Sequence, residues 1–186
     1  KITFLISTLS GGGAEGVCVG IANTFVERGW LVDLVVLNLK NEAYLNRLSD
    51  KVNLIVLNVN RARYSGVSLI RYIIKNKVKK VLVFNYELSV VLVILKYFLN
   101  FNTKIISRNI STFSAKMKQY YQLSLWDRYV VRPLIKFFYH RVDYVINQSN
   151  GMRDDLISIY PHLKDNSTVI FNPIPVHLID FAKKYD

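Results

Sequence analysis

Apolar and polar residues follow two recurring patterns along the chain. Short, continuous apolar runs are typical of strands that a parallel sheet buries on both faces. Longer segments with apolar residues three and four positions apart are typical of helices that pack one side on such a sheet. The runs predict strands over residues 1–7, 31–38, 52–57, 80–84, 103–107, 142–147 and 168–171. The periodic segments predict helices over residues 14–28, 42–48, 68–77, 89–99, 115–141 and 151–160.

The order of these elements predicts an α/β fold, a Rossmann-like domain with a mostly parallel sheet of six or seven strands and helices on both faces. Pro133 interrupts the fifth helix, where it either kinks that helix or begins a second one. The apolar run 81–99 contains Asn85, Glu87 and Lys96. Because a charge inside a bilayer costs about 2.5–3.5 kcal/mol, we expect a strand and a buried helix there rather than a membrane span.

Composition sets further limits on the class of protein. The chain has 186 residues, of which 51% are apolar, so it can form one buried core. Cys18 is the single cysteine and has no partner for a disulfide, which fits a reducing compartment. The histidines His140, His162 and His177 lack the spacing of metal ligands. We therefore expect no metal and no cofactor.

Positive charge is concentrated in one part of the chain. The formal net charge is +12, and residues 104–141 contribute +7 of it, from eight Lys or Arg residues against the single acid Asp127. Such a segment favours an anionic partner: a phosphate-bearing ligand, an acidic membrane or a nucleic acid. A solvated basic surface without a partner is the alternative.

Polar residues follow the predicted strands. Parallel sheets bind ligands beyond the carboxyl ends of their strands, so these positions are candidates for a site. They contain neither a carboxylate pair nor a Ser-His-Asp set, which favours binding by hydrogen bonds and phosphate contacts. The candidate site residues at these positions are Asn85, Tyr86, Glu87, Arg108, Asn109 and Ser149. Glu87 acts either as a base or only as a carboxylate at the positive end of a helix, and Arg108 either holds a phosphate or is a surface residue.

A glycine loop follows the first predicted strand. Gly11, Gly13 and Gly16 match the dinucleotide-binding pattern G-x-G-x-x-G, but residues 8–10 separate them from the strand and the second strand ends in Asn38 instead of an acid. We therefore exclude a nicotinamide site. Glycines at a helix N-terminus let backbone N–H groups approach an anion. A tight turn that only packs the helix on the sheet is the alternative.

Three motifs resemble the large retaining glycosyltransferase family 4. The first is Ile6-Ser7-x-Leu9-x-Gly11-Gly12-Gly13-Ala14-Glu15, followed by Ala22-Asn23 and Gly29-Trp30-x-Val32-x-Leu34-Val35. The others are Val142-Asp143-Tyr144-Val145-Ile146-x-x-Ser149-x-Gly151-Met152-x-x-Asp155-Leu156 and Val169-Ile170-x-Asn172-Pro173-Ile174. Trp30 stands where the family usually has histidine.

The resemblance implies the N-terminal half of a GT-B fold, in which two Rossmann-like domains face each other. Residues 1–172 would form the acceptor-side domain and residues 173–186 would begin the hinge. The C-terminal donor domain with its Glu-x7-Glu motif is absent, so the chain alone would be inactive. The complete enzyme would be a hexosyltransferase that moves a sugar from a nucleotide-sugar to a glycan acceptor without a metal. Gly11, Gly12 and Gly13 would approach the donor diphosphate, and Arg108, Asn109 or Glu87 would be the candidates for catalysis. The residues on the acceptor side would be Asn85, Tyr86, Arg108, Asn109 and Ser149.

A basic and aromatic segment predicts membrane attachment. Arg128, Arg132 and Lys136 recur every four residues beside an apolar stripe that includes Trp126. They would dock on anionic lipid, which fits a lipid-linked acceptor in surface polysaccharide assembly and a cytoplasmic enzyme on the inner face of the membrane. A core-packing face with a solvated back is the alternative. No RNA or DNA motif is present and we expect no nucleic-acid partner, but a basic nucleic-acid-binding or non-catalytic ligand-binding module is the competing interpretation.

Overall fold

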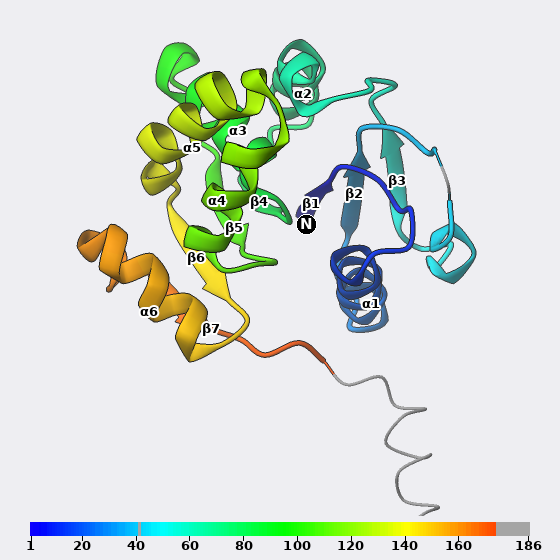
Figure 1. The fold of residues 1–186 in the computed structure, drawn as a ribbon. Coiled ribbons are helices and arrows are strands. Elements are labelled where there is room, and N and C mark those ends of the chain that lie inside the picture. The colour runs from blue at the N-terminus through cyan, green and yellow to red at the C-terminus, as the bar shows by residue number, and fades with distance from the viewer. Residues whose placement is uncertain (41, 174–186) are drawn as a thin grey trace, which may run out of the picture.

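The seven apolar runs form seven strands of one parallel sheet (Figure 1). The structure, a computed structural model, describes residues 1–40 and 42–173. The strands are β1 (Ile2–Ile6), β2 (Val32–Val36), β3 (Asn53–Val56), β4 (Lys80–Val83), β5 (Lys104–Arg108), β6 (Tyr144–Asn147) and β7 (Ser167–Val169). Their order in the sheet is β3-β2-β1-β4-β5-β6-β7. This order confirms the predicted Rossmann-like fold, because the chain reverses direction across the sheet between β1 and β4.

Helices cover the two faces of the sheet unequally. They are α1 (Gly13–Glu27), α2 (Gly66–Lys75), α3 (Tyr86–Leu99), α4 (Phe113–Leu123), α5 (Arg132–Phe138) and α6 (Asn150–Ile159). One core cluster packs α2, α3, α4, α5 and α6 against one face of the sheet, with side chains such as Leu88, Tyr139 and Leu156. The other cluster joins α1 to the opposite face through Cys18, Val19 and Ala22. One face is therefore packed by five of these helices, and the other by α1.

The predicted helix over residues 42–48 is wrong, because that segment contains only the single 3-10 turn η1 (Leu45–Arg47). The helix predicted over residues 115–141 is also wrong as a continuous unit. Ser124 is extended and ends α4, the π-helical turn η3 (Asp127–Val131) follows, and α5 begins directly after it. Pro133 lies in the first turn of α5, which continues directly from η3.

The apolar run over residues 81–99 forms most of β4 and all of α3, which agrees with the predicted strand and buried helix. The Lys96 ammonium pairs with the Asp143 carboxylate at 2.8 Å, so the charge in this run has a partner. Within the described part of the chain, no helix combines the length and the apolar character needed to cross a membrane. Of the predicted hinge, Pro173 is described, and residues 174–186 lie outside the described residues.

Candidate functional site

The site begins where the sheet changes direction, between the carboxyl ends of β1 and β4. Ser7 follows β1 and Asn85 follows β4, and the Asn85 amide donates to the Ser7 hydroxyl at 2.6 Å. The Asn85 side-chain oxygen also accepts from the backbone N–H of Leu88 at 2.8 Å, which caps the N-terminus of α3. The chain leaves this point toward α1 on one face and toward α3 on the other, so both helices begin at the place where such sheets bind ligands.

The glycine loop leads from β1 into α1. Gly11 has φ +108°, a conformation that side chains rarely adopt, and Gly12 is the N-cap of α1. A Cβ on Gly12 would collide with the Glu15 carboxylate, whereas a Cβ on Gly13 would meet no atom within 4 Å. The first turn of α1 therefore presents free backbone N–H groups beside open space, which is the arrangement that binds an anion.

Asn85, Tyr86 and Glu87 start α3, but their side chains differ in accessibility. The Tyr86 ring is buried against Phe113, and its hydroxyl donates to the Ser111 carbonyl at 2.7 Å. The Glu87 carboxylate accepts from the hydroxyl of Tyr120, whose pKa is raised by burial and by the negative charge of Glu87. Asn85 and Glu87 line a groove described below. The structure thus places two of the three next to open space and one in the core.

Arg108 ends β5 and contacts the segment that follows β7. Its guanidinium donates to the Ile170 carbonyl at 3.3 Å and to the Asn172 side-chain oxygen at 2.9 Å, and burial lowers its pKa. Arg108 is 2% exposed, and its Nε has no hydrogen-bond partner among the described residues. In this structure, the arginine binds the residues just before the predicted hinge.

Asn109 and Ser149 belong to the packing of β5, β6 and α6. The Asn109 amide donates to the Asn147 side-chain oxygen at 2.9 Å, and its oxygen accepts from the Tyr139 hydroxyl. Both ends of this buried side chain are therefore occupied. Ser149 caps α6 by accepting from the Met152 N–H at 3.2 Å. The structure does not bring these two residues together with Glu87 and Asn85 in one pocket.

A groove of about 570 Å³ opens from the Ser7–Asn85 link along α3. We call it the α3 groove. One end is polar, with Ser7, Asn85 and Glu87, while most of its wall is aliphatic. The wall is made by α3, by the turn η2 (Ala62–Tyr64) with the start of α2, and by η3 with α5. Its further lining residues are Arg61, Ala62, Arg63, Gly66, Val90, Val91, Ile94, Leu95, Trp126, Asp127, Val130, Val131, Leu134 and Ile135.

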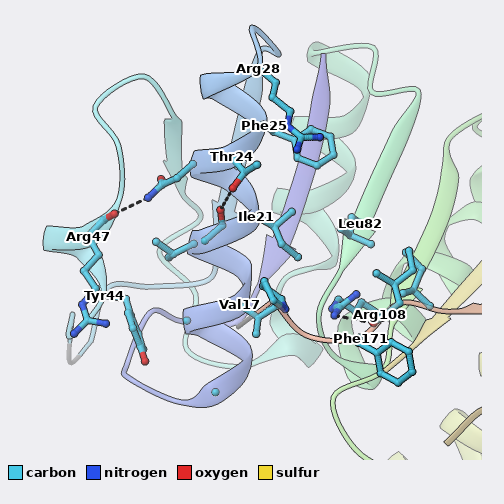
Figure 2. Close-up of a pocket in the computed structure, with 18 residues that line it drawn as sticks. Val17, Ile21, Thr24, Phe25, Arg28, Tyr44, Arg47, Leu82, Arg108 and Phe171 are labelled. Carbon is cyan, nitrogen blue, oxygen red and sulfur yellow. Dashed lines mark hydrogen bonds between the residues drawn. The ribbon is translucent and has the colours of Figure 1, made fainter. Parts of the chain in front are cut away.

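A second hollow, of about 870 Å³, extends around α1. Figure 2 shows Val17, Ile21 and Phe25 pointing from α1 toward Leu82 and Arg108 on the sheet. Phe171 lies at the same edge and is 68% exposed. This hollow is the part of the sheet face that α1 leaves open, and the chain passes it on the way to Pro173.

The three predicted docking cations lie on two consecutive helical elements, Arg128 on η3 and Arg132 and Lys136 on α5. The guanidinium groups of Arg128 and Arg132 lie over the Tyr121 ring, at 3.7 and 5.4 Å from its centroid. Lys136 is exposed, and Trp126 is 47% exposed at the wall of the α3 groove. Two of the three cations, Arg128 and Arg132, thus already interact with an aromatic ring of the same segment.

Comparison with known sequences identifies the family. Residues 11–178 match the sequence profile described as Glycosyltransferase Family 4. This chain belongs to Glycosyltransferase Family 4. A comparison with curated proteins gave no match.

Solved structures similar to this family member are GT-B glycosyltransferases. Alr3699/HepE of Anabaena, solved with UDP, has a TM-score of 0.64 at 17% identity over 96% of this chain and 45% of its own. The lipopolysaccharide outer core galactosyltransferase WaaB has a TM-score of 0.66 at 14% identity over 93% and 46%. MurG of Acinetobacter baumannii has 0.57 at 11% over 94% and 46%. The chain therefore has the fold of the N-terminal half of these proteins and spans less than half of their length.

Sequence reasoning missed the α3 groove of this glycosyltransferase domain. Its arginines, Arg61 and Arg63, precede α2 and are far in sequence from Trp126, against which Arg63 packs. The signal that was available is the apolar character of α3 on all sides, since a helix that is apolar all round contacts more than the sheet.

Proposed function

We propose that this chain is the acceptor-side domain of a retaining glycosyltransferase. The complete enzyme transfers a hexose from a nucleotide-sugar to a lipid-linked glycan during assembly of a bacterial surface polysaccharide. The observation that carries this proposal is the junction of β1 and β4, where the Ser7–Asn85 hydrogen bond lies at the polar end of the α3 groove and the loop after β1 leads into the N-terminus of α1. The donor would bind on one side of this junction and the acceptor on the other.

The N-terminus of α1 is the donor side of this proposal. Gly11 and Gly12 keep the loop free of side chains, and Gly13 leaves its first turn open. A diphosphate suits that position because both the backbone N–H groups and the helix dipole favour negative charge. Two similar structures, Alr3699/HepE of Anabaena and MnaA of S. aureus, were solved with UDP, which supports a nucleotide-linked donor.

The hollow around α1 is the surface for a second domain. Its apolar floor and its position beside Phe171 and Pro173 support contact with the part of the protein that binds the donor. Arg108 holds Asn172 at 2.9 Å and thereby fixes the direction in which the chain leaves. We therefore infer that Arg108 positions the two domains.

The basic segment and its apolar neighbours are the surface for an anionic membrane. Leu125 is 73% exposed, Tyr129 65% and Phe137 59%, and they surround Trp126, Arg128, Arg132 and Lys136. Apolar side chains flanked by cations favour the interface of an anionic bilayer. The enzyme would then work on the cytoplasmic face of the membrane.

Gly13→Leu tests the donor side in the two-domain protein. The side chain fits this domain, because a Cβ at Gly13 meets nothing, but it would occupy the space of the diphosphate. We expect kcat/KM for the nucleotide-sugar to fall about a hundredfold, since a small displacement of a bound group has effects of this size. Gly151→Leu is the matched control, because Gly151 is also in the first turn of a helix with no atom within 4 Å of its Cβ position. Equal activity of the two variants would contradict the donor site.

A further inference from the structure

The α3 groove has the shape of a channel for one apolar chain. Its floor is α3, with Val90, Val91, Ile94 and Leu95. Ala62 and Gly66 stand on one side, and Val130, Val131, Leu134 and Ile135 on the other. A volume of about 570 Å³ lies within the range of about 300–1,000 Å³ that ligand pockets occupy. An aliphatic wall of this extent gains from contact with an apolar ligand in proportion to the area that it removes from water.

The two sides of the groove meet through one pair of side chains. The guanidinium of Arg63 lies over the Trp126 ring, 5.1 Å from its centroid. Arg63 comes from η2 and Trp126 immediately precedes η3, so this contact joins the two walls. The groove is therefore bounded by α3 below and partly bridged by a cation and an aromatic ring, which suits a narrow ligand better than a folded protein segment.

Positive charge is available at the groove. Arg61 and Arg63 are exposed, and among the described residues neither forms an ion pair with a carboxylate. Two acids also line the groove: Glu87 accepts from the Tyr120 hydroxyl, and Asp127 accepts from the Ser124 hydroxyl at 2.6 Å. The two arginines are the positive groups next to the apolar channel, and phosphate is the group that guanidinium binds through paired hydrogen bonds.

The groove is continuous with exposed apolar side chains. Trp126 belongs to its wall, and the neighbouring Leu125 is 73% exposed. On the other side of the Arg63–Trp126 contact, Tyr64 is 60% exposed. The rim of the groove on both sides of the Arg63–Trp126 contact therefore carries exposed apolar side chains that can contact a lipid surface.

We propose that the α3 groove binds a lipid with a single apolar chain that ends in a phosphate, with the chain along Val91, Ile94 and Leu134 and the phosphate at Arg61 and Arg63. The role of this lipid as the carrier of the acceptor glycan rests on the proposed function. The binding itself does not, because it needs only the residues of this domain. The polar end of the groove, at Asn85 and Glu87, then receives the part of the ligand beyond the phosphate.

Trp126 supplies a direct signal for this binding. The chain has two tryptophans, and Trp30 packs against Phe25 beside α1, away from the groove. In a Trp30→Phe background, Trp126 is the single tryptophan, so its fluorescence measures occupancy of the groove. The probe is farnesyl phosphate below its micellar concentration, and farnesol and inorganic phosphate provide the apolar part and the anionic part separately.

Two variants alter the groove and two alter the surface next to it. Leu134→Glu places a charge on the wall at a side chain that is already 38% exposed, so the fold should tolerate it. Val67→Glu is its control, on α2 and 67% exposed, outside the groove. Arg61→Gln with Arg63→Gln removes the proposed phosphate contacts. Arg71→Gln with Lys75→Gln removes the same charge from exposed positions of α2. Circular dichroism melts check that each variant is folded.

We expect a saturable change of Trp126 fluorescence with farnesyl phosphate, at least about tenfold weaker binding of farnesol, and no change with inorganic phosphate. Leu134→Glu and the Arg61/Arg63 variant should each weaken binding by about tenfold or more, and their controls by less than about twofold. Absence of saturable binding, equal losses in groove and control variants, or equal affinity for farnesol would overturn the proposal. Binding of farnesyl phosphate by a domain whose two-domain protein transfers no sugar would keep the groove and overturn the proposed function instead.

Discussion

Buried polar groups are hydrogen-bonded differently at the two edges of the sheet, the one where the strands begin and the one where they end. At the edge where the strands begin, Asp33 is buried and has three donors: Lys1 at 2.7 Å, Tyr72 at 2.5 Å and Asn53 at 2.9 Å. At the edge where the strands end, the Arg108 Nε and the Asn147 side-chain nitrogen are buried without partners among the described residues. The first edge satisfies its polar groups internally and serves stability. The second edge has glycines, open N–H groups and a groove, so a ligand can form the most favourable contacts there.

Asp33→Ala should have the largest effect on stability. The substitution leaves the Tyr72 hydroxyl and the Asn53 amide without their acceptor, and breaking a buried hydrogen-bonded network costs about 3 kcal/mol. Asn85→Ala at the opposite edge removes an N-cap and should cost only about 1 kcal/mol. Urea unfolding of both variants measures the difference, and equal losses would show that the two edges do not differ in this way.

The same network predicts how stability depends on pH. Burial raises the pKa of Asp33, but the hydrogen bonds and charge of Lys1, Tyr72 and Asn53 lower it more, so the net pKa is below the usual value. The stabilisation is therefore complete above the pKa of an unfolded aspartate, about 4, and is lost as pH falls through the lowered value. Unfolding of the parent should become easier below about pH 4, and Asp33→Asn should lose part of this dependence.

The exposed Asp50 provides the control for that measurement. Asp50→Asn should keep the pH dependence of the parent. If Asp33→Asn also keeps it, the acid sensitivity of the domain comes from other carboxyl groups.

The proposed membrane attachment of the basic segment can be tested with anionic vesicles. Replacing Arg128, Arg132 and Lys136 by glutamine should weaken binding to phosphatidylglycerol vesicles by about tenfold. This loss of affinity is smaller than three fully available cations would cause, because Arg128 and Arg132 already contact Tyr121. Molar salt should release the parent, since it shortens screening to about 3 Å. Glutamine at Lys75, Lys77 and Lys79, around the opposite edge, removes the same charge. Sedimentation with vesicles would argue against the docking surface if both triple variants bind alike.

The smallest effect concerns two glycines, Gly20 within α1 and Gly11 in the loop before it. Gly20 is in the middle of the helix with no atom within 4 Å of its Cβ position, so Gly20→Ala should stabilise the domain by about 0.5–1 kcal/mol. Gly11→Ala should destabilise it instead, because Gly11 has φ +108° and a Cβ there would approach Ala43 at 3.2 Å. Thermal melts measure both signs. A stabilising Gly11→Ala would show that the loop does not need its glycine.

The sequence predicted the sheet well, because continuous apolar runs leave few alternatives to buried parallel strands. Helix ends were predicted less well, although local signals existed. Ser124 and Asp127 form a cap in which the Ser124 oxygen accepts from the Asp127 N–H at 3.1 Å, and this S-x-x-D pattern marks a helix start that the prediction overlooked.

The candidate site could be predicted only by position along the chain. The strand ends identified Asn85, Glu87 and Arg108, but not which side chains would face open space. Asn109 is occupied by Asn147 and Tyr139, partners that are more than 25 residues away and that no local pattern reveals. The groove depends in the same way on contacts such as that of Arg63 with Trp126.

We propose that this domain supplies the acceptor side of a glycosyltransferase and needs a second domain for donor chemistry. The most direct measurement compares nucleotide release from a panel of nucleotide-sugars by the 186-residue chain and by the two-domain protein, each with a lipid-phosphate acceptor. We expect acceptor-dependent release by the two-domain protein and none by the chain alone. Turnover by the isolated chain, or none by the two-domain protein with any donor, would contradict the account.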